Sequence, residues 1–160
     1  MVNDLVIRSA TPDDIEAAAM LGAQIVRLHH ATNPKRFFLI DDVEQGYAWW
    51  LRQEVERAEA IVLVAELGGE IVGYAYGAIE ERDWNLLLDR HGAVHDLCVA
   101  QNARRKGVGR AMVSAVMARL EELGAERIVA RAMVQNEGAQ RLCQSLGFEP
   151  TMLEMTREVG

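Results

Sequence analysis

Cysteine is scarce in this sequence, with Cys98 and Cys143 as the two thiols among 160 residues. Two cysteines are too few for a disulfide scaffold, so we expect reduced thiols in a cytoplasmic protein. Long apolar runs are missing as well, and the first residues lack the basic and then apolar pattern of a secretion signal. These absences predict a protein that has no membrane partner.

Positive charge is also in short supply. The 17 lysines and arginines are outnumbered by 24 aspartates and glutamates, which leaves a formal net charge of −7. Nonspecific binding to nucleic acid depends on neutralising phosphates, so we expect no nucleic-acid partner. Linkers, low-complexity tracts and internal repeats are missing too, and the length is ordinary for one domain. We therefore expect a single domain over residues 1–160.

The apolar residues that are present change their period along the chain. Strand patterns cover residues 5–10, 61–67, 71–79, 93–99, 127–132 and 151–159, and helical spacing covers 12–29, 41–54, 108–123 and 136–146. The predicted order is βααββ-βαβαβ, with a hairpin at Gly68-Gly69 and a βαβ unit after Ala93. We predict an α/β domain of the α+β type, a mixed and mostly antiparallel sheet with helices on both faces.

The stretch QNARRKGVGRAMV, residues 101–113, places two glycines and several cations directly before a helix. The N-terminus of a helix presents free backbone N–H groups and a positive dipole end, which suits a phosphate group. Gly107 and Gly109 lack Cβ atoms and let a ligand approach the main chain closely. On this stretch alone, a plain helix start with solvated cations stays open.

Spacing excludes two common phosphate loops for this stretch. A Walker A loop needs G-x-x-x-x-G-K-[ST], and this string does not occur. The dinucleotide fingerprint G-x-G-x-x-G would need a glycine where Met112 stands. If the stretch binds an anion, it does so as a loop of another class.

Three motifs, in order along the chain, resemble the GNAT N-acetyltransferases, a family that binds acetyl-CoA. Residues 104–109, RRKGVG, match the family's pattern [Q/R]-x-x-G-x-[G/A] after a strand. Residues 7–14, IRSATPDD, resemble its first strand and helix start. The family's short-helix pattern is met by Asn136, Ala139, Leu142 and Gly147-Phe148. The resemblance spans nearly the whole chain and implies a GNAT-like domain with acetyl-CoA as the donor.

The resemblance also implies which residues bind the donor. Main-chain groups of one strand would bind pantetheine, amides of the loop would bind pyrophosphate, and one side chain at the short helix would contact the cofactor. These positions are Leu97, Cys98, Val99, Arg104, Arg105, Lys106, Gly107, Val108, Gly109, Arg110 and Asn136. A plain helix cap stays open for Asn136. The implied reaction is direct attack of an amine on the thioester carbon, with a base to deprotonate the amine and strand amides to polarise the carbonyl.

His95 is the first candidate for the base. It matches a position where some family members carry a glutamate base, and an imidazole can take a proton near neutral pH. A strand-end histidine held by hydrogen bonds is the structural alternative. Strict strand alternation turns Asp96 away from the face that His95 uses, so we expect Asp96 to be structural.

Two further residues are candidates for proton transfer. Glu81 lies in the acidic run of Glu80, Glu81 and Asp83, which would attract an ammonium group or hold a water that takes its proton; a solvated loop is the alternative. Cys143 stands where many family members carry a tyrosine acid, so it either replaces that acid or only packs. No histidine has cysteine or acidic partners at metal-ligand spacing, so we expect no metal.

The sequence thus predicts an acetyl-CoA-dependent N-acetyltransferase whose acceptor is a primary amine. A small-molecule amine is the first choice, and a protein N-terminus stays open. Phe37 and Phe38 are predicted to line the acceptor pocket. A noncatalytic acyl-CoA-binding or sensing module is the alternative, favoured by the altered position at Cys143. Exposed strand edges near the C-terminus make a homodimer a further option.

Overall fold

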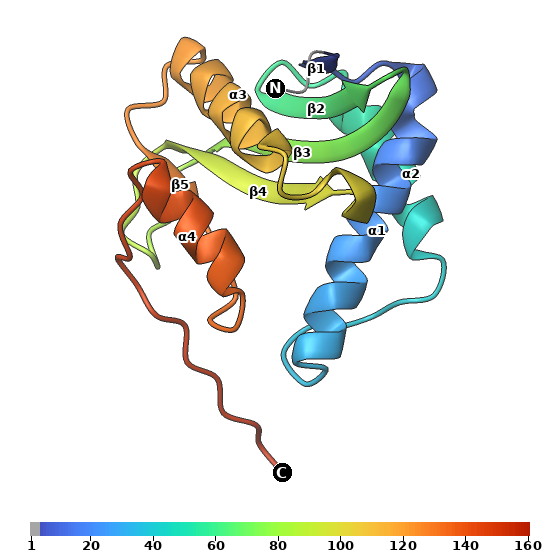
Figure 1. Cartoon of the computed structure of the whole chain (residues 1–160). Coiled ribbons are helices and arrows are strands. Elements are labelled where there is room, and N and C mark those ends of the chain that lie inside the picture. The colour runs from blue at the N-terminus through green and yellow to red at the C-terminus, as the bar shows by residue number, and fades with distance from the viewer. Residues whose placement is uncertain (1–3) are drawn as a thin grey trace.

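The computed structural model describes residues 4–160. The strands are β1 (Leu5–Ser9), β2 (Ala60–Leu67), β3 (Glu70–Glu80), β4 (His91–Val99) and β5 (Ile128–Ala130). The helices are α1 (Ile15–Thr32), α2 (Val43–Glu54), α3 (Val108–Glu122) and α4 (Glu137–Ser145), with short turns η1 (Pro12–Asp14) and η2 (Gln101–Ala103). The sheet follows chain order and is antiparallel except for its parallel β4–β5 pair. The predicted mixed sheet with helices on both faces is confirmed (Figure 1).

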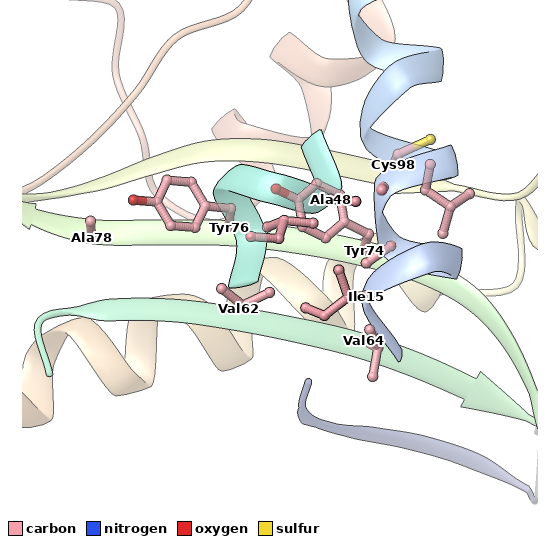
Figure 2. Close-up of a cluster of buried hydrophobic side chains, with 12 residues drawn as sticks. Ile15, Ala48, Val62, Val64, Tyr74, Tyr76, Ala78 and Cys98 are labelled. Carbon is pink, nitrogen blue, oxygen red and sulfur yellow. The ribbon is translucent and has the colours of Figure 1, made fainter. Parts of the chain in front are cut away.

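Each face of the sheet has its own apolar core. On one face, Ile15 of α1 lies in a cluster with Val64 and Tyr74 of the sheet, all three with no exposed surface (Figure 2). On the other face, Met112 of α3 belongs to a second cluster with Leu63 of β2. Among the described residues, no helix is long and apolar enough to cross a membrane.

The start of the first helical segment is fixed by charge. Pro12 occupies the first helical position, as the sequence predicted, and the Asp14 carboxylate accepts the Thr11 backbone N–H at 2.7 Å. Arg8 of β1 donates to both oxygens of Asp14, at 2.6 and 3.0 Å. This pair ties the first strand to the start of α1, which then lies across the face that carries the site.

The predicted last strand, residues 151–159, is wrong. Residues 149–160 carry no regular structure, and Met152, Leu153, Met155 and Val159 are between 70 and 92% exposed. β5 spans three residues, so the outer edge of the sheet offers little backbone for another strand to pair with. The chain leaves α4 at Gly147, where φ is +90°, and runs away from the sheet (Figure 1). The observed order therefore ends in a helix and an extended tail.

Candidate active site

A bulge in β4 shapes the centre of the candidate site. The β3–β4 register pairs Tyr76 with Asp96 and then Gly77 with Val94, which leaves His95 as an extra residue without a partner across the ladder. A bulge of this kind breaks strand alternation, so neighbouring side chains no longer point to opposite faces.

The bulge places His95 and Asp96 on the same side of the sheet. The His95 ring stacks on Tyr76 with 5.6 Å between ring centroids, and Asp96 accepts hydrogen bonds from Tyr47 and Tyr74. The expectation that alternation turns Asp96 away from the face of His95 is therefore wrong. Both side chains line one pocket.

This pocket has a volume of about 440 Å³ and opens between α2 and the sheet. The residues that line it are Tyr47, Trp50, Tyr76, Glu80, His95 and Asp96. Three of the six are aromatic and two are acidic, and the ring of Trp50 packs edge-on against Tyr76 with 4.6 Å between centroids. A pocket with aromatic walls and carboxylates suits a small organic cation.

His95 forms a close pair with Glu80, the last residue of β3. The distance from His95 Nε2 to Glu80 Oε1 is 2.7 Å, and both side chains keep about a third or more of their surface exposed. An ionised carboxylate only accepts hydrogen bonds, so Nε2 is the donor and Nδ1 carries the lone pair of the neutral ring. Nδ1 has no hydrogen-bond partner within residues 4–160, which leaves it able to accept a proton from a ligand.

Asp96 is held by two phenols. Tyr47 and Tyr74 donate to the same oxygen, Oδ2, at 3.1 and 2.9 Å. Burial raises the pKa of Asp96 above its ordinary value of 3.8, and the two hydrogen bonds only partly oppose that shift. Burial and the nearby carboxylate raise the pKa of both phenols, so both remain protonated donors.

A third carboxylate, that of Glu54, lies close to the pocket and already pairs with an arginine. Glu54 at the end of α2 is 7% exposed, accepts a hydrogen bond from the Tyr76 hydroxyl, and pairs with Arg57 at 3.0 Å. The hydroxyl of Tyr76 is therefore committed to Glu54, and burial raises the pKa of this phenol as well. The ring of Tyr76, rather than its hydroxyl, faces the pocket contents.

The edge of β4 opens directly after the paired part of the sheet. The parallel pairing with β5 ends at Val94 and Ala130, so residues 95–99 have no strand on that side. These residues include Leu97, Cys98 and Val99, which the resemblance assigned to pantetheine. Cys98 belongs to the core under α1, while Leu97 and Val99 pack toward α3. Main-chain groups at an edge that no neighbouring strand covers suit a ligand that binds as an extended chain.

The loop before α3 has the backbone that close approach of an anion needs. Gly107 is the N-cap of α3 with φ of +81°, and Arg105 also has a positive φ of 63°. The first helical bond runs from Ala111 N–H to the Gly107 carbonyl, so the amides of Val108, Gly109 and Arg110 remain available. A Cβ built on Gly107 would meet no atom within 4 Å, which leaves open space in front of the backbone.

The four cations of this loop divide into two pairs. Arg104 donates to the Val99 carbonyl at 2.9 Å, and Arg110 donates to Ser145 of α4 at 2.7 Å, so both help to fix the loop. Arg105 and Lys106 are exposed and make no side-chain hydrogen bond or ion pair within the described residues. A helix N-terminus, a left-handed glycine and two uncommitted cations fit a pyrophosphate group.

Three predicted residues lie outside the pocket. Glu81 is exposed and pairs with Arg90 at 3.4 Å, so the structure brings its neighbour Glu80, and not Glu81, to His95. Asn136 caps α4 through a 3.1 Å bond from Ala139 N–H, which confirms the helix cap. Contact of this side chain with the cofactor is compatible with the cap and stays a prediction. Cys143 is half-buried on α4, where burial raises the pKa of its thiol.

Sequence reasoning missed most of the pocket wall. Phe38 is 76% exposed and Phe37 packs edge-on against His29, so neither lines the pocket. Tyr47 and Trp50 do line it, from the helix predicted over residues 41–54, and no motif singled them out. Within residues 4–160, no three His, Cys, Asp or Glu side chains gather closely enough to hold a metal ion.

Comparison with known proteins places this geometry in a family. The model of the Acetyltransferase (GNAT) family matches residues 23–148. An N-alpha-acetyltransferase of Sulfurisphaera tokodaii is 30% identical over 148 residues, which cover 89% of this chain and 79% of that protein. The L-amino acid N-acyltransferase MnaT of Escherichia coli is 32% identical over 112 residues, 69% of this chain and 61% of that protein.

Solved structures share the fold. A mutant of the BH1408 protein from Bacillus halodurans aligns with a TM-score of 0.81 at 22% identity, covering 96% of this chain and 99% of that one. The aminoglycoside acetyltransferase AAC(6')-Iy, in complex with a CoA-containing bisubstrate analogue, aligns with a TM-score of 0.76 at 18% identity, covering 98% of both chains. The family match and the relatives together confirm the resemblance: this chain belongs to the GNAT family of acetyltransferases, whose donor is acetyl-CoA.

Proposed function

We propose that this chain moves the acetyl group of acetyl-CoA to a primary amine by direct attack, with His95 as the general base. The bulge in β4 carries the proposal, because it brings His95 and Asp96 into one pocket beside the open edge of the same strand. The edge and the loop before α3 suit the donor, and the acidic, aromatic pocket suits the acceptor.

Acetyl-CoA, when bound, supplies an acetyl group activated as a thioester. We assign its binding to the main chain of Leu97, Cys98 and Val99 and to the loop of residues 104–110. Of the loop side chains, Arg105 and Lys106 are free to meet phosphate, while Arg104 and Arg110 hold the loop in place. Asn136 then contributes as the cap that fixes α4 beside the loop.

His95 acts on the amine through Nδ1. Because Nε2 donates to Glu80, the neutral ring presents the lone pair of Nδ1 to an amine in the pocket. Nδ1 takes a proton from the amine nitrogen, and the carboxylate of Glu80 stabilises the imidazolium that results. Glu80 is therefore a positioning residue, and the Tyr76 ring that stacks on His95 limits rotation of the imidazole.

A small-molecule amine is the acceptor that we propose first. The pocket volume of about 440 Å³ gives room for a small ligand. A protein N-terminus is the second candidate, since α-amino groups share the same nucleophile.

The test is release of coenzyme A thiol over a panel of primary amines, with parent protein and three variants. His95→Gln should lower kcat by about a hundredfold or more, and Glu80→Gln by about tenfold, while affinity for coenzyme A stays unchanged. The variant Glu81→Gln tests whether Glu81, as the sequence predicted, or Glu80, which pairs with His95, assists the base. A loss of kcat equal to that of Glu80→Gln would restore Glu81 to its predicted role. Full activity in His95→Gln would overturn the assignment of the base.

The same assay distinguishes the proposed enzyme from the alternative function. A noncatalytic acyl-CoA-binding module would bind acetyl-CoA and turn over no amine in the panel. The pairing of His95 with Glu80 favours the enzyme, because a binding module has no need of an oriented base.

We also propose that residues 1–160 act as one domain in the cytoplasm and that two copies pair as a homodimer. Scarce cysteine supports the location. The exposed apolar residues of the tail after Phe148 support pairing, because a second copy would cover them. Light scattering on the purified protein, with and without residues 149–160, tests the homodimer.

A further inference from the structure

The charges around the pocket are unbalanced. Glu80 and Asp96 are both acidic, and neither lysine nor arginine lines the pocket. The guanidinium of Arg57, near Tyr76, pairs with Glu54 outside the pocket. His29 also lies near Asp96, and its Nδ1 is hydrogen-bonded to the Ile25 carbonyl at 2.8 Å. A ligand that enters the pocket therefore meets negative charge with no positive side chain assigned to balance Asp96.

One oxygen of Asp96 is free for a ligand. Both phenols donate to Oδ2, and Oδ1 has no hydrogen-bond partner within residues 4–160. No fully buried side-chain oxygen or nitrogen in that part of the chain lacks a partner, so Oδ1 keeps accessible surface. Asp96 lines the pocket, so this unused acceptor belongs to a side chain of the pocket wall. The two carboxylates thus differ: Glu80 serves the His95 ring, and Asp96 offers an unused acceptor.

We propose that the acceptor is a diamine or polyamine without a carboxylate, bound by a second ammonium group at Asp96 Oδ1. This proposal rests on the proposed function and names its substrate class. One amine lies at His95 and loses its proton there, while the second stays charged and pairs with Asp96. The rings of Tyr47 and Trp50 flank the cation and favour it through their faces.

The same geometry discriminates against an α-amino acid. Its carboxylate would sit beside the reacting nitrogen and face Glu80 and Asp96 with no cation among the pocket residues. A charge that loses its water without gaining a partner is strongly disfavoured. A monoamine escapes this repulsion and gains nothing from Asp96.

Three matched ligands test the proposal: cadaverine, L-lysine and pentylamine. L-lysine adds one carboxylate to cadaverine, and pentylamine lacks its second ammonium group. Calorimetry with protein saturated with coenzyme A measures binding without turnover. Cadaverine should bind at least about tenfold more tightly than either partner, because it alone gains a charge pair with Asp96 without bringing in a carboxylate. Equal or tighter binding of L-lysine or pentylamine, or no measurable binding of all three, would overturn the proposal.

The variant Asp96→Asn assigns the effect to one side chain. Its amide oxygen still accepts from the two phenols, so the pocket wall is kept, and melting checks the fold. The advantage of cadaverine over pentylamine should fall below about threefold, while the affinity for pentylamine changes little. Glu70→Gln, a change of charge at an exposed position outside the pocket, should keep the full advantage. An advantage that survives in Asp96→Asn would place the second ammonium group elsewhere and overturn the proposal.

Thiol release with the same ligands separates this proposal from the proposed function. Tight, selective binding of cadaverine without any acetylation would reject the enzyme and keep the cation site. Acetylation that favours L-lysine would keep the enzyme and reject the substrate class.

Discussion

Asp14 and Asp96 are two aspartates, largely shielded from solvent, that the molecule treats in opposite ways. Asp14 accepts hydrogen bonds from both terminal nitrogens of the Arg8 guanidinium and from the backbone N–H of Thr11, and these bonds hold its pKa at about 2. Asp96 receives two neutral phenols, and burial raises its pKa above 3.8. The charge of Asp14 is balanced by an arginine of the same chain, whereas the two side chains that donate to Asp96 are neutral.

The two environments give the two carboxylates opposite effects on the stability of the folded state. A buried carboxylate with a cation and backbone donors stabilises the folded state, and Asp14 uses this to fix the start of α1. A buried carboxylate without a cation costs stability, which the protein recovers only when a cationic ligand arrives. The account therefore predicts opposite effects from the same substitution at the two positions.

The largest expected effect is the loss of stability in Asp14→Asn. This change removes the ion pair and leaves Arg8 without its main partner, so the free energy of unfolding near pH 7 should fall by about 2–4 kcal/mol. The pKa of Asp14 is depressed, so its contribution is present above 3.8 and is lost as pH falls toward about 2. Denaturant unfolding across this pH range should show the gap between parent and variant closing.

Asp13→Asn is the matched control, because Asp13 is the exposed neighbour of Asp14. It should change the free energy of unfolding by less than about 0.5 kcal/mol. Equal losses in the two variants would mean that the charge of the first helical turn, and not the Arg8 pair, stabilises this region.

The surroundings of these two carboxylates also differ in how well the sequence predicts them. The stretch IRSATPDD predicted the helix start near Asp14, and the RRKGVG motif predicted the loop before α3, because both signals are local in the chain. The pocket could not be predicted, because it depends on one register shift between β3 and β4. Alternation in β4 put Asp96 and His95 on opposite faces, and the acidic run could not tell Glu80 from Glu81. The last strand failed for a similar reason: pairing depends on the length of β5, which the sequence pattern overstated.

Two glycines show a similar contrast, one in the core of the fold and one in the loop before α3. A Cβ on Gly73 would lie 2.6 Å from Met112 Sδ and 2.9 Å from Ala65 Cβ, so Gly73→Ala should destabilise the fold by about 1–3 kcal/mol. A Cβ on Gly107 meets nothing within 4 Å, and its cost is a strained backbone at φ of +81° in the loop that we propose binds the donor. Gly107→Val should lower acetyl-CoA affinity by at least about tenfold, or about 1.4 kcal/mol, as titration calorimetry would measure. Unchanged affinity in a folded Gly107→Val protein would remove the loop from the site.

A smaller effect of opposite sign is expected for Asp96→Asn. The folded pKa of Asp96 is raised, so its ionised form costs stability above that pKa and costs nothing below the unfolded value of 3.8. Asp96→Asn should therefore raise the free energy of unfolding by up to about 1 kcal/mol near pH 7 and leave it unchanged near pH 3. Destabilisation of the variant near pH 7 would show that the two phenols compensate the charge after all.

The smallest effect is expected at Cys143. Its thiol is half-buried on α4, outside the pocket, and burial keeps it protonated by raising its pKa. Cys143→Ala should keep turnover within about tenfold of the parent, with the loss following from packing. A loss of about a hundredfold in kcat, with melting and acetyl-CoA affinity preserved, would show that the thiol takes part in the chemistry.

The most direct test of the contrast is a carbon-13 NMR titration of the aspartate carboxyl groups, assigned with Asp14→Asn and Asp96→Asn. The account predicts that Asp14 titrates near 2 and that Asp96 titrates above its ordinary value of 3.8. Saturating cadaverine, with coenzyme A present, should lower the midpoint of Asp96 and leave that of Asp14 in place, since a cation favours the ionised form. A midpoint for Asp96 at or below 3.8 that cadaverine does not move would contradict the claim that this carboxylate is held for a cationic acceptor.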